Sequence, residues 1–121
     1  MGRVDAVNQV LRSLQSGTPD IEASALISDD GLMIASALPQ HIEEMRVAGM
    51  SSTLLSLGTR AAIELGRGDL QQVLIRGDNG YGVMVRAGEG TMLLVLASKE
   101  AKLGLIFLDM SRAVQEIKKV L

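Results

Sequence analysis

The chain has 121 residues and a formal net charge of −2, and 47% of its residues are hydrophobic. This length and hydropathy predict one folded domain over residues 1–121 with its own core, and they exclude a disordered chain. The sequence has no cysteine and only two aromatic residues, Tyr81 and Phe107. Disulfides and thiolate catalysis are therefore excluded, and the basic patch and stacking aromatics typical of a nucleic-acid binder are missing.

The N-terminal third predicts a helix followed by a β-hairpin. Two short apolar runs, 23–28 and 32–37, lie on either side of Asp29-Asp30-Gly31, which is typical of a hairpin turn. Before them, apolar residues three and four positions apart predict a helix over 3–16, with the stripe Val4, Val7, Leu11 and Leu14.

A long proline-free segment, 40–66, predicts the main helix of the chain. We expect its larger apolar side chains to face the sheet: Val47, Met50, Leu54, Leu57, Ala61 and Leu65. Beside them runs a second line of mostly small residues: Ala48, Ser51, Leu55, Gly58 and Ala62. One short sheet has no room to bury both lines, so we expect the second line to form a helix–helix seam with another copy. The alternative is that it packs within its own domain.

Three strands are predicted after this helix, over 70–76, 81–87 and 92–97, separated by glycine-rich turns. The unbroken apolar run 92–97 predicts a central strand covered on both faces, whereas the polar start of 70–76 predicts an edge strand. A last helix follows, for which we expect Ser98 as the N-cap and Glu100 in the first turn. Its apolar stripe is Leu103, Ile106, Phe107, Met110, Ala113, Val114, Ile117 and Leu121.

Together these elements predict an α/β fold of the α+β sandwich type. The order is helix-strand-strand-helix-strand-strand-strand-helix. We expect a five-stranded antiparallel sheet with the long helix on one face and the two terminal helices on the other.

Several segments, in this order and spacing, resemble the Roadblock / dynein light-chain family, and in particular its prokaryotic MglB-like branch. The resemblance covers nearly the whole chain, and the segments that carry it are 25–36, 68–77 with Gly80-Tyr81, Ala87-Gly88, 101–105 and 111–113. No single motif among them is diagnostic, because each consists mostly of small and apolar residues. Some MglB-like regulators carry terminal extensions that this sequence lacks, so contacts made by such extensions are not expected.

The resemblance implies a homodimer in which the edge strand after the long helix pairs with its copy. The edge residues of that dimer interface would be Leu70, Gln72, Leu74 and Arg76, next to the helix seam. It also implies a non-catalytic regulator or adaptor that binds a small Ras-like GTPase, with a GTPase-activating effect in some relatives. The partner contacts that we expect on the long helix are Met45, Gly49, Ser52, Ser56 and Arg60. The alternative is a scaffold or dimerisation module for another protein complex, without effect on GTP hydrolysis.

Catalytic chemistry finds little support in the residues. His41 is the only histidine and is interpreted as a solvated residue before the long helix. The glycine-rich segment 77–82 lacks a Gly-Lys-Ser/Thr ending and precedes a strand, so it is interpreted as a hairpin turn and not as a phosphate-binding loop. We therefore expect no catalytic residue, cofactor or metal, no nucleic-acid partner, no membrane insertion and a cytoplasmic location. A ligand-sensing or enzymatic domain remains a third hypothesis, which would need a pocket with converging polar groups.

Overall fold

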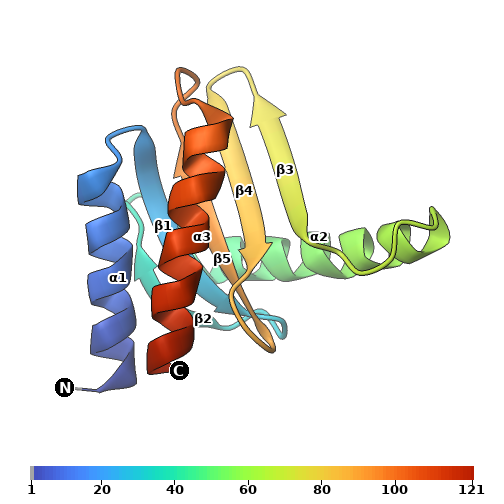
Figure 1. The fold of residues 1–121 in the computed structure, drawn as a ribbon, viewed down its shortest axis with the longest axis horizontal. Coiled ribbons are helices and arrows are strands. Elements are labelled where there is room, and N and C mark those ends of the chain that lie inside the picture. The colour runs from blue at the N-terminus through green and yellow to red at the C-terminus, as the bar shows by residue number, and fades with distance from the viewer. Residues whose placement is uncertain (1) are drawn as a thin grey trace.

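A computed structural model describes residues 2–121, and its eight elements follow the predicted order (Figure 1). The elements are α1 (Arg3–Gly17), β1 (Ile21–Ser28), β2 (Met33–Ala37), α2 (Glu44–Glu64), β3 (Gln72–Gly77), β4 (Gly80–Arg86), β5 (Thr91–Ala97) and α3 (Leu103–Val120). The predicted fold class is confirmed, and the predicted element boundaries are off by only a few residues.

The five strands form one antiparallel sheet in the order β2-β1-β5-β4-β3. β5 is central, as its continuous apolar sequence predicts, and it pairs with β1 on one side and β4 on the other. In this register Leu93 is opposite Leu26 of β1 and Val85 of β4. β3 lies at one edge of the sheet, as predicted, and pairs with β4 alone.

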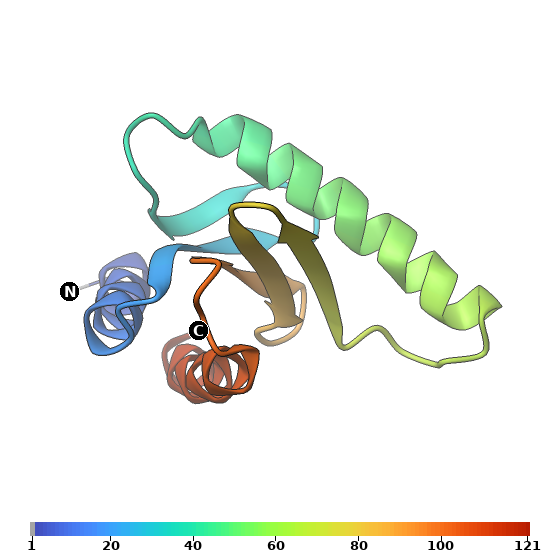
Figure 2. The same ribbon diagram turned by 90° about the horizontal axis from the view of Figure 1, so that it is seen from above.

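The sheet is covered by two helices on one face and by one helix on the other (Figure 2). α1 and α3 lie side by side, and their apolar stripes pack on side chains that include Leu26, Leu93 and Val95. α2 packs on the opposite face against Ala25, Met92 and other residues of the central strands. Neighbouring residues of β5 alternate between the two layers, which is why every one of them is apolar except Thr91 at its start.

The orientation of α2 differs from the prediction. Its sheet-facing residues are the small line, with Ala48 at 1%, Ser51 at 5% and Leu55 at 7% exposure. Most of the larger line points away from the core, since Met50 is 55%, Leu57 62% and Leu65 69% exposed. Val47 and Leu54 of that line are half-buried and pack against the core on this face. The expectation that the larger side chains face the sheet was therefore wrong for Met50, Leu57, Ala61 and Leu65. The physical reason is close approach, because small side chains let the helix backbone lie near the sheet.

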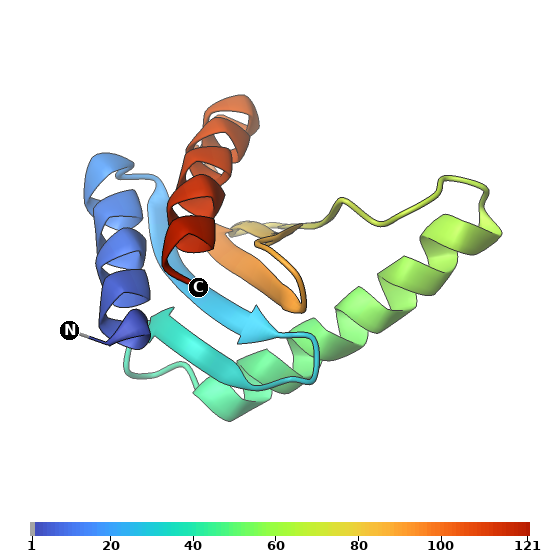
Figure 3. The ribbon, with the colours of Figure 1, turned by 60° about the horizontal axis from the view of Figure 1, so that its bottom comes forward.

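The C-terminal part of α2 extends past the edge of the sheet at β3, as Figure 3 shows. The chain returns through residues 65–71, and every residue from Ile63 to Asp69 is exposed. This overhang has no counterpart on the β2 side.

The start of α3 also differs from the prediction, since its N-cap is Lys102 and not Ser98. Ser98 instead joins the end of β5 to the turn before β1. Its backbone N–H donates to the Asp20 carbonyl oxygen at 2.8 Å, and its hydroxyl donates to Asp20 Oδ1 at 3.1 Å. Glu100 consequently lies before the first turn of the helix. Ser98, which the local sequence favoured as an N-cap, thus forms hydrogen bonds with a segment far away in the sequence.

Among residues 2–121, no helix has both the length and the hydropathy needed to cross a bilayer.

Candidate interaction surface

The edge strand β3 is the first open feature of the molecule. Its backbone pairs with β4 from Gln72 opposite Val85 to Gly77 opposite Gly80, and it is the last strand of the sheet on this side. All its residues except Val73 are exposed, with Leu74 at 45% and Ile75 at 47%. A flat edge strand with exposed apolar side chains is a ready template for pairing with another strand.

The second open feature is an apolar stripe on α2, which comprises Val47, Met50, Leu54, Leu57, Ala61 and Leu65. It is the line of side chains that was expected to face the sheet. Its members are half-buried at Val47 and Leu54 and exposed at the other four positions. Large apolar side chains collected on one exposed helix flank are typical of protein–protein contacts.

The small line splits into two parts along α2. Ala48, Ser51 and Leu55 are covered by this chain's own sheet, so their predicted place in a seam between subunits needs revision. Gly58 and Ala62 are half-buried and lie above the start of β3. A Cβ at Gly58 would come within 3.2 Å of Leu70 Cδ2 and 3.4 Å of Val73 Cγ2. Gly58 therefore allows the strand to approach the helix inside one subunit.

A groove of about 480 Å³ lies between the C-terminal half of α2 and β3. Its walls include Ala61 and Ala62 from the helix and Leu70 and Val73 from the strand side. The groove joins the apolar stripe to the open edge. Of the predicted edge residues, Leu70 and Gln72 line this groove, whereas Leu74 and Arg76 lie further along β3.

The residues predicted to contact a partner form a second flank of α2. Met45 is 85% exposed, and Gly49, Ser56 and Arg60 are also exposed. Ser52 lies among them but is half-buried, because its hydroxyl donates to the Asp29 carbonyl oxygen at 2.7 Å. This flank is therefore mixed in polarity and separate from the apolar stripe.

Asp29 holds the N-terminal half of α2 in place from the hairpin turn. Besides accepting from Ser52, its carboxylate accepts from Arg86 Nη1 at 2.7 and 2.9 Å, and its N–H donates to the Gly90 carbonyl oxygen at 2.9 Å. The sequence indicated only that Asp29 belongs to a turn. The pairing with Arg86 joins positions 57 apart, and no local signal predicts it.

Two sequence features were weighed for catalytic or binding chemistry, His41 and the glycine-rich segment 77–82. His41 is exposed in the segment before α2, and the described part of the chain holds no group of three or more His, Cys, Asp or Glu side chains that could bind a metal ion. Within the segment 77–82, Asp78 and Asn79 form the tight turn between β3 and β4, with Gly77 of β3 opposite Gly80, and residues 80–82 belong to β4. What the structure assembles is a surface built from a strand edge and one helix.

These features define the class of protein: a small α/β-sandwich module with an open sheet edge and a projecting helix. Residues 7–97 match the model of the Roadblock/LC7 domain, and the chain belongs to that family. Roadblock proteins are mainly regulators and adaptors.

Known relatives cover nearly the full chain. The uncharacterized protein MJ1340 of Methanocaldococcus jannaschii is 40% identical over 112 residues, which span 93% of this chain and 96% of that protein. The Roadblock/LC7 domain of Streptomyces avermitilis is 29% identical with a TM-score of 0.87, covering 93% of this chain and 94% of that one. MglB of Myxococcus xanthus shares the fold at 21% identity, with a TM-score of 0.89 and coverage of 97% and 88%.

Proposed function

We propose that this protein is a non-catalytic homodimeric regulator that binds a small Ras-like GTPase through α2. The observation that carries the proposal is the coincidence of the open β3 edge, the exposed apolar stripe and the α2 overhang at one side of the molecule. The GTPase as partner rests on the resemblance to the MglB-like branch of the family.

A second copy would cover both open features at once. Pairing of β3 with its own copy would continue the sheet across a two-fold axis and satisfy the free backbone groups of the edge. The α2 overhang projects over the place where that second sheet would begin, so the two helices would meet through their apolar stripes. The proposed dimer interface is therefore β3, with Leu74 and Arg76, plus the stripe around Leu57.

The second flank of α2 would remain free in such a dimer. This surface would combine one large apolar side chain, one cation and two small residues: Met45, Arg60, Gly49 and Ser56. Half-buried Ser52, held by its hydrogen bond to Asp29, would lie at its border. A surface of this composition suits a regulatory protein–protein contact. Acting on a GTPase requires no reactive side chain on this surface, because a bound partner can shift the switch segments between conformations.

The test is a titration of the protein with a Ras-like GTPase from the same organism, loaded with GDP or with a non-hydrolysable GTP analogue. We expect binding that differs between the two nucleotide states. Met45→Ala should raise the Kd about tenfold, which corresponds to about 1.4 kcal/mol, if Met45 is a central contact. Arg60→Glu should slow association and change its salt dependence.

Lys118→Glu is the matched control for the charge reversal, because Lys118 is an exposed cation on α3, on the far face of the sheet. Absence of binding in both nucleotide states would remove the GTPase from the proposal. Binding without any change in the rate of GTP hydrolysis would favour the adaptor alternative, in which the dimer only connects other proteins.

A further inference from the structure

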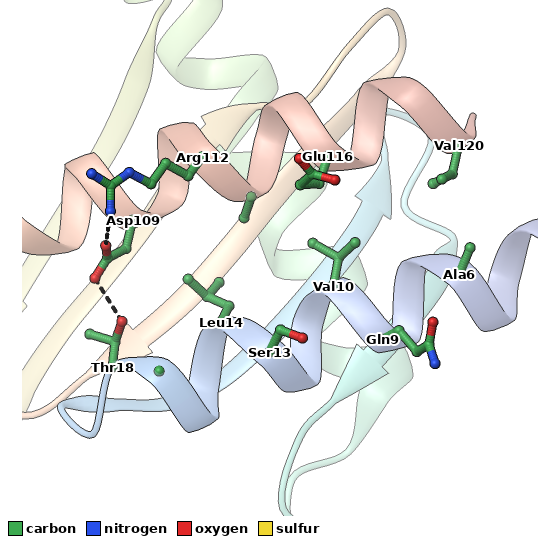
Figure 4. Close-up of a pocket in the computed structure, with 12 residues that line it drawn as sticks. Ala6, Gln9, Val10, Ser13, Leu14, Thr18, Asp109, Arg112, Glu116 and Val120 are labelled. Atoms are coloured by element: carbon green, nitrogen blue, oxygen red, sulfur yellow. Dashed lines mark hydrogen bonds and ion pairs between the residues drawn. The ribbon is translucent and has the colours of Figure 1, made fainter.

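The face of the molecule opposite α2 carries a groove that the proposed function does not use. It has a volume of about 730 Å³ and runs between α1 and α3 (Figure 4). Small and apolar side chains such as Ala6, Val10 and Ala113 line it. One end is closed by Thr18, whose hydroxyl donates to Asp109 Oδ2 at 2.6 Å, and Val120 lies at the other end.

The solvent-facing flank of α3, which borders this groove at Arg112 and Glu116, carries an ordered set of exposed side chains. Leu105 and Leu108 are 55% and 46% exposed, so two leucines face solvent on a helix that already buries a full apolar stripe. The next turns of the same flank carry Arg112, Glu116 and Lys119, with side-chain exposures of 73%, 59% and 71%. The flank thus begins apolar and continues with alternating charge.

We propose that this flank binds the same flank of a second copy, with the two α3 helices antiparallel across a two-fold axis. One register matches three pairs of side chains: Leu108 with Val120, Asp109 with Lys119, and Arg112 with Glu116. The two-fold axis makes each pair occur twice. Opposite charges then meet in both polar pairs, and Leu108 of each copy lies over the end of the partner's groove at Val120.

The charge pattern favours this register over the neighbouring registers. A slide of four residues, about one helical turn, places Arg112 opposite its own copy in one direction and Glu116 opposite its own copy in the other. Like charges facing each other across an interface are unfavourable. The pairs within α3, Lys119 Nζ to Glu116 Oε1 at 3.3 Å and Arg112 Nη1 to Asp109 Oδ1 at 3.9 Å, are retained and join the new pairs in one network.

This contact lies on the face of the sheet opposite α2 and is independent of the proposed β3 interface. Where both form, each β3 dimer presents two α3 flanks, so dimers associate further into tetramers and longer assemblies. Exposed ion pairs contribute little individually and are screened by salt. The association is therefore weak and strengthens at low ionic strength.

The absence of cysteine from the sequence permits a direct test of the register. Two single variants, Arg112→Cys and Glu116→Cys, are prepared separately and then mixed under mild oxidation. Disulfide-linked pairs should form in the mixture several-fold faster than in either variant alone, because position 112 faces 116 and not itself. Equal rates in all three samples, or faster linkage of one variant with itself, would overturn the proposal.

Charge exchange gives a second, equilibrium test by sedimentation at low salt. Arg112→Glu should raise the Kd of this association about tenfold. Combining it with Glu116→Arg should lower the Kd again, because the two copies of the 112–116 pair return with reversed sign. The recovery is partial, since the exchanged charges repel Asp109 and Lys119 of their own helix. Lys118→Glu carries the same charge change outside the flank and should leave the Kd unchanged. A double variant as weak as Arg112→Glu alone would contradict the pairing.

Both tests are repeated in a Leu57→Asp background, which removes the proposed dimer through α2. Cysteine linkage that persists there supports the α3 contact, whatever the fate of the β3 dimer. Linkage that disappears together with the β3 dimer would show that no separate α3 contact exists. Circular dichroism of each variant confirms that the fold is intact.

Discussion

Asp29 illustrates, at the level of single residues, how one side chain connects segments far apart in the sequence. It belongs to the β1–β2 turn, yet its three polar groups bond to α2, to the end of β4 and to the β4–β5 turn. Because the Ser52 contact lies under the predicted partner flank, Asp29 positions that flank without being part of it.

Replacing Asp29 with Asn should lower the free energy of unfolding by about 1 kcal/mol at most, because both charged side chains are more than a third exposed and water screens their attraction. Urea denaturation measures the change. Asp30→Asn, in the same turn but exposed, is the matched control and should be neutral within about 0.5 kcal/mol. A double-mutant cycle with Arg86→Gln isolates the pair, and a coupling energy of zero would show that the ion pair contributes nothing.

The orientation of α2 is the main question at the level of helices and strands. Periodicity predicted a helix there correctly, but it defined two adjacent lines and could not show which one faces inward. The larger side chains were assigned to the core on hydrophobicity alone. The sheet instead buries Ala48, Ser51 and Leu55 of the small line. A Cβ at Gly31 of the hairpin turn would lie 3.4 Å from Ser52 Cβ, which shows how closely the helix approaches.

Two alanine substitutions separate these orientations. Leu55→Ala should cost about 2–5 kcal/mol of stability because it opens a cavity in the α2 layer, whereas Leu57→Ala should change stability by less than about 0.5 kcal/mol in the isolated subunit. Urea titrations at concentrations where the chain is monomeric give both values. Equal losses for the two leucines would mean that α2 is rotated about its axis, with Leu57 as deeply buried against the sheet as Leu55.

For the molecule as a whole, the proposed dimer determines whether the exposed apolar surface is covered. We expect sedimentation equilibrium of the native chain at moderate salt to give the mass of a dimer. Leu57→Asp should give a folded monomer, since a charge in the stripe opposes helix pairing while leaving the core intact. Ser56→Asp, one residue away on the partner flank, should remain dimeric. A native chain that is monomeric at high concentration would contradict the proposed interface.

Local patterns in the sequence were enough to establish the elements, their order, the central place of β5 and the edge place of β3. The informative patterns are alternation and unbroken apolar runs in strands, three-and-four spacing in helices, and glycine-rich turns. The resemblance to the Roadblock family, carried by short segments of small and apolar residues, was confirmed by the family match.

Three features became known only from the three-dimensional arrangement: which line of α2 is buried, that Ser98 bonds to Asp20 and does not cap α3, and that Asp29 pairs with Arg86. Each depends on the distance between segments that are remote in the chain, and a periodic pattern contains no information about that distance. The same holds for the interaction surfaces. The sequence pattern of an apolar stripe is the same whether the chain's own sheet covers the stripe or a second molecule covers it.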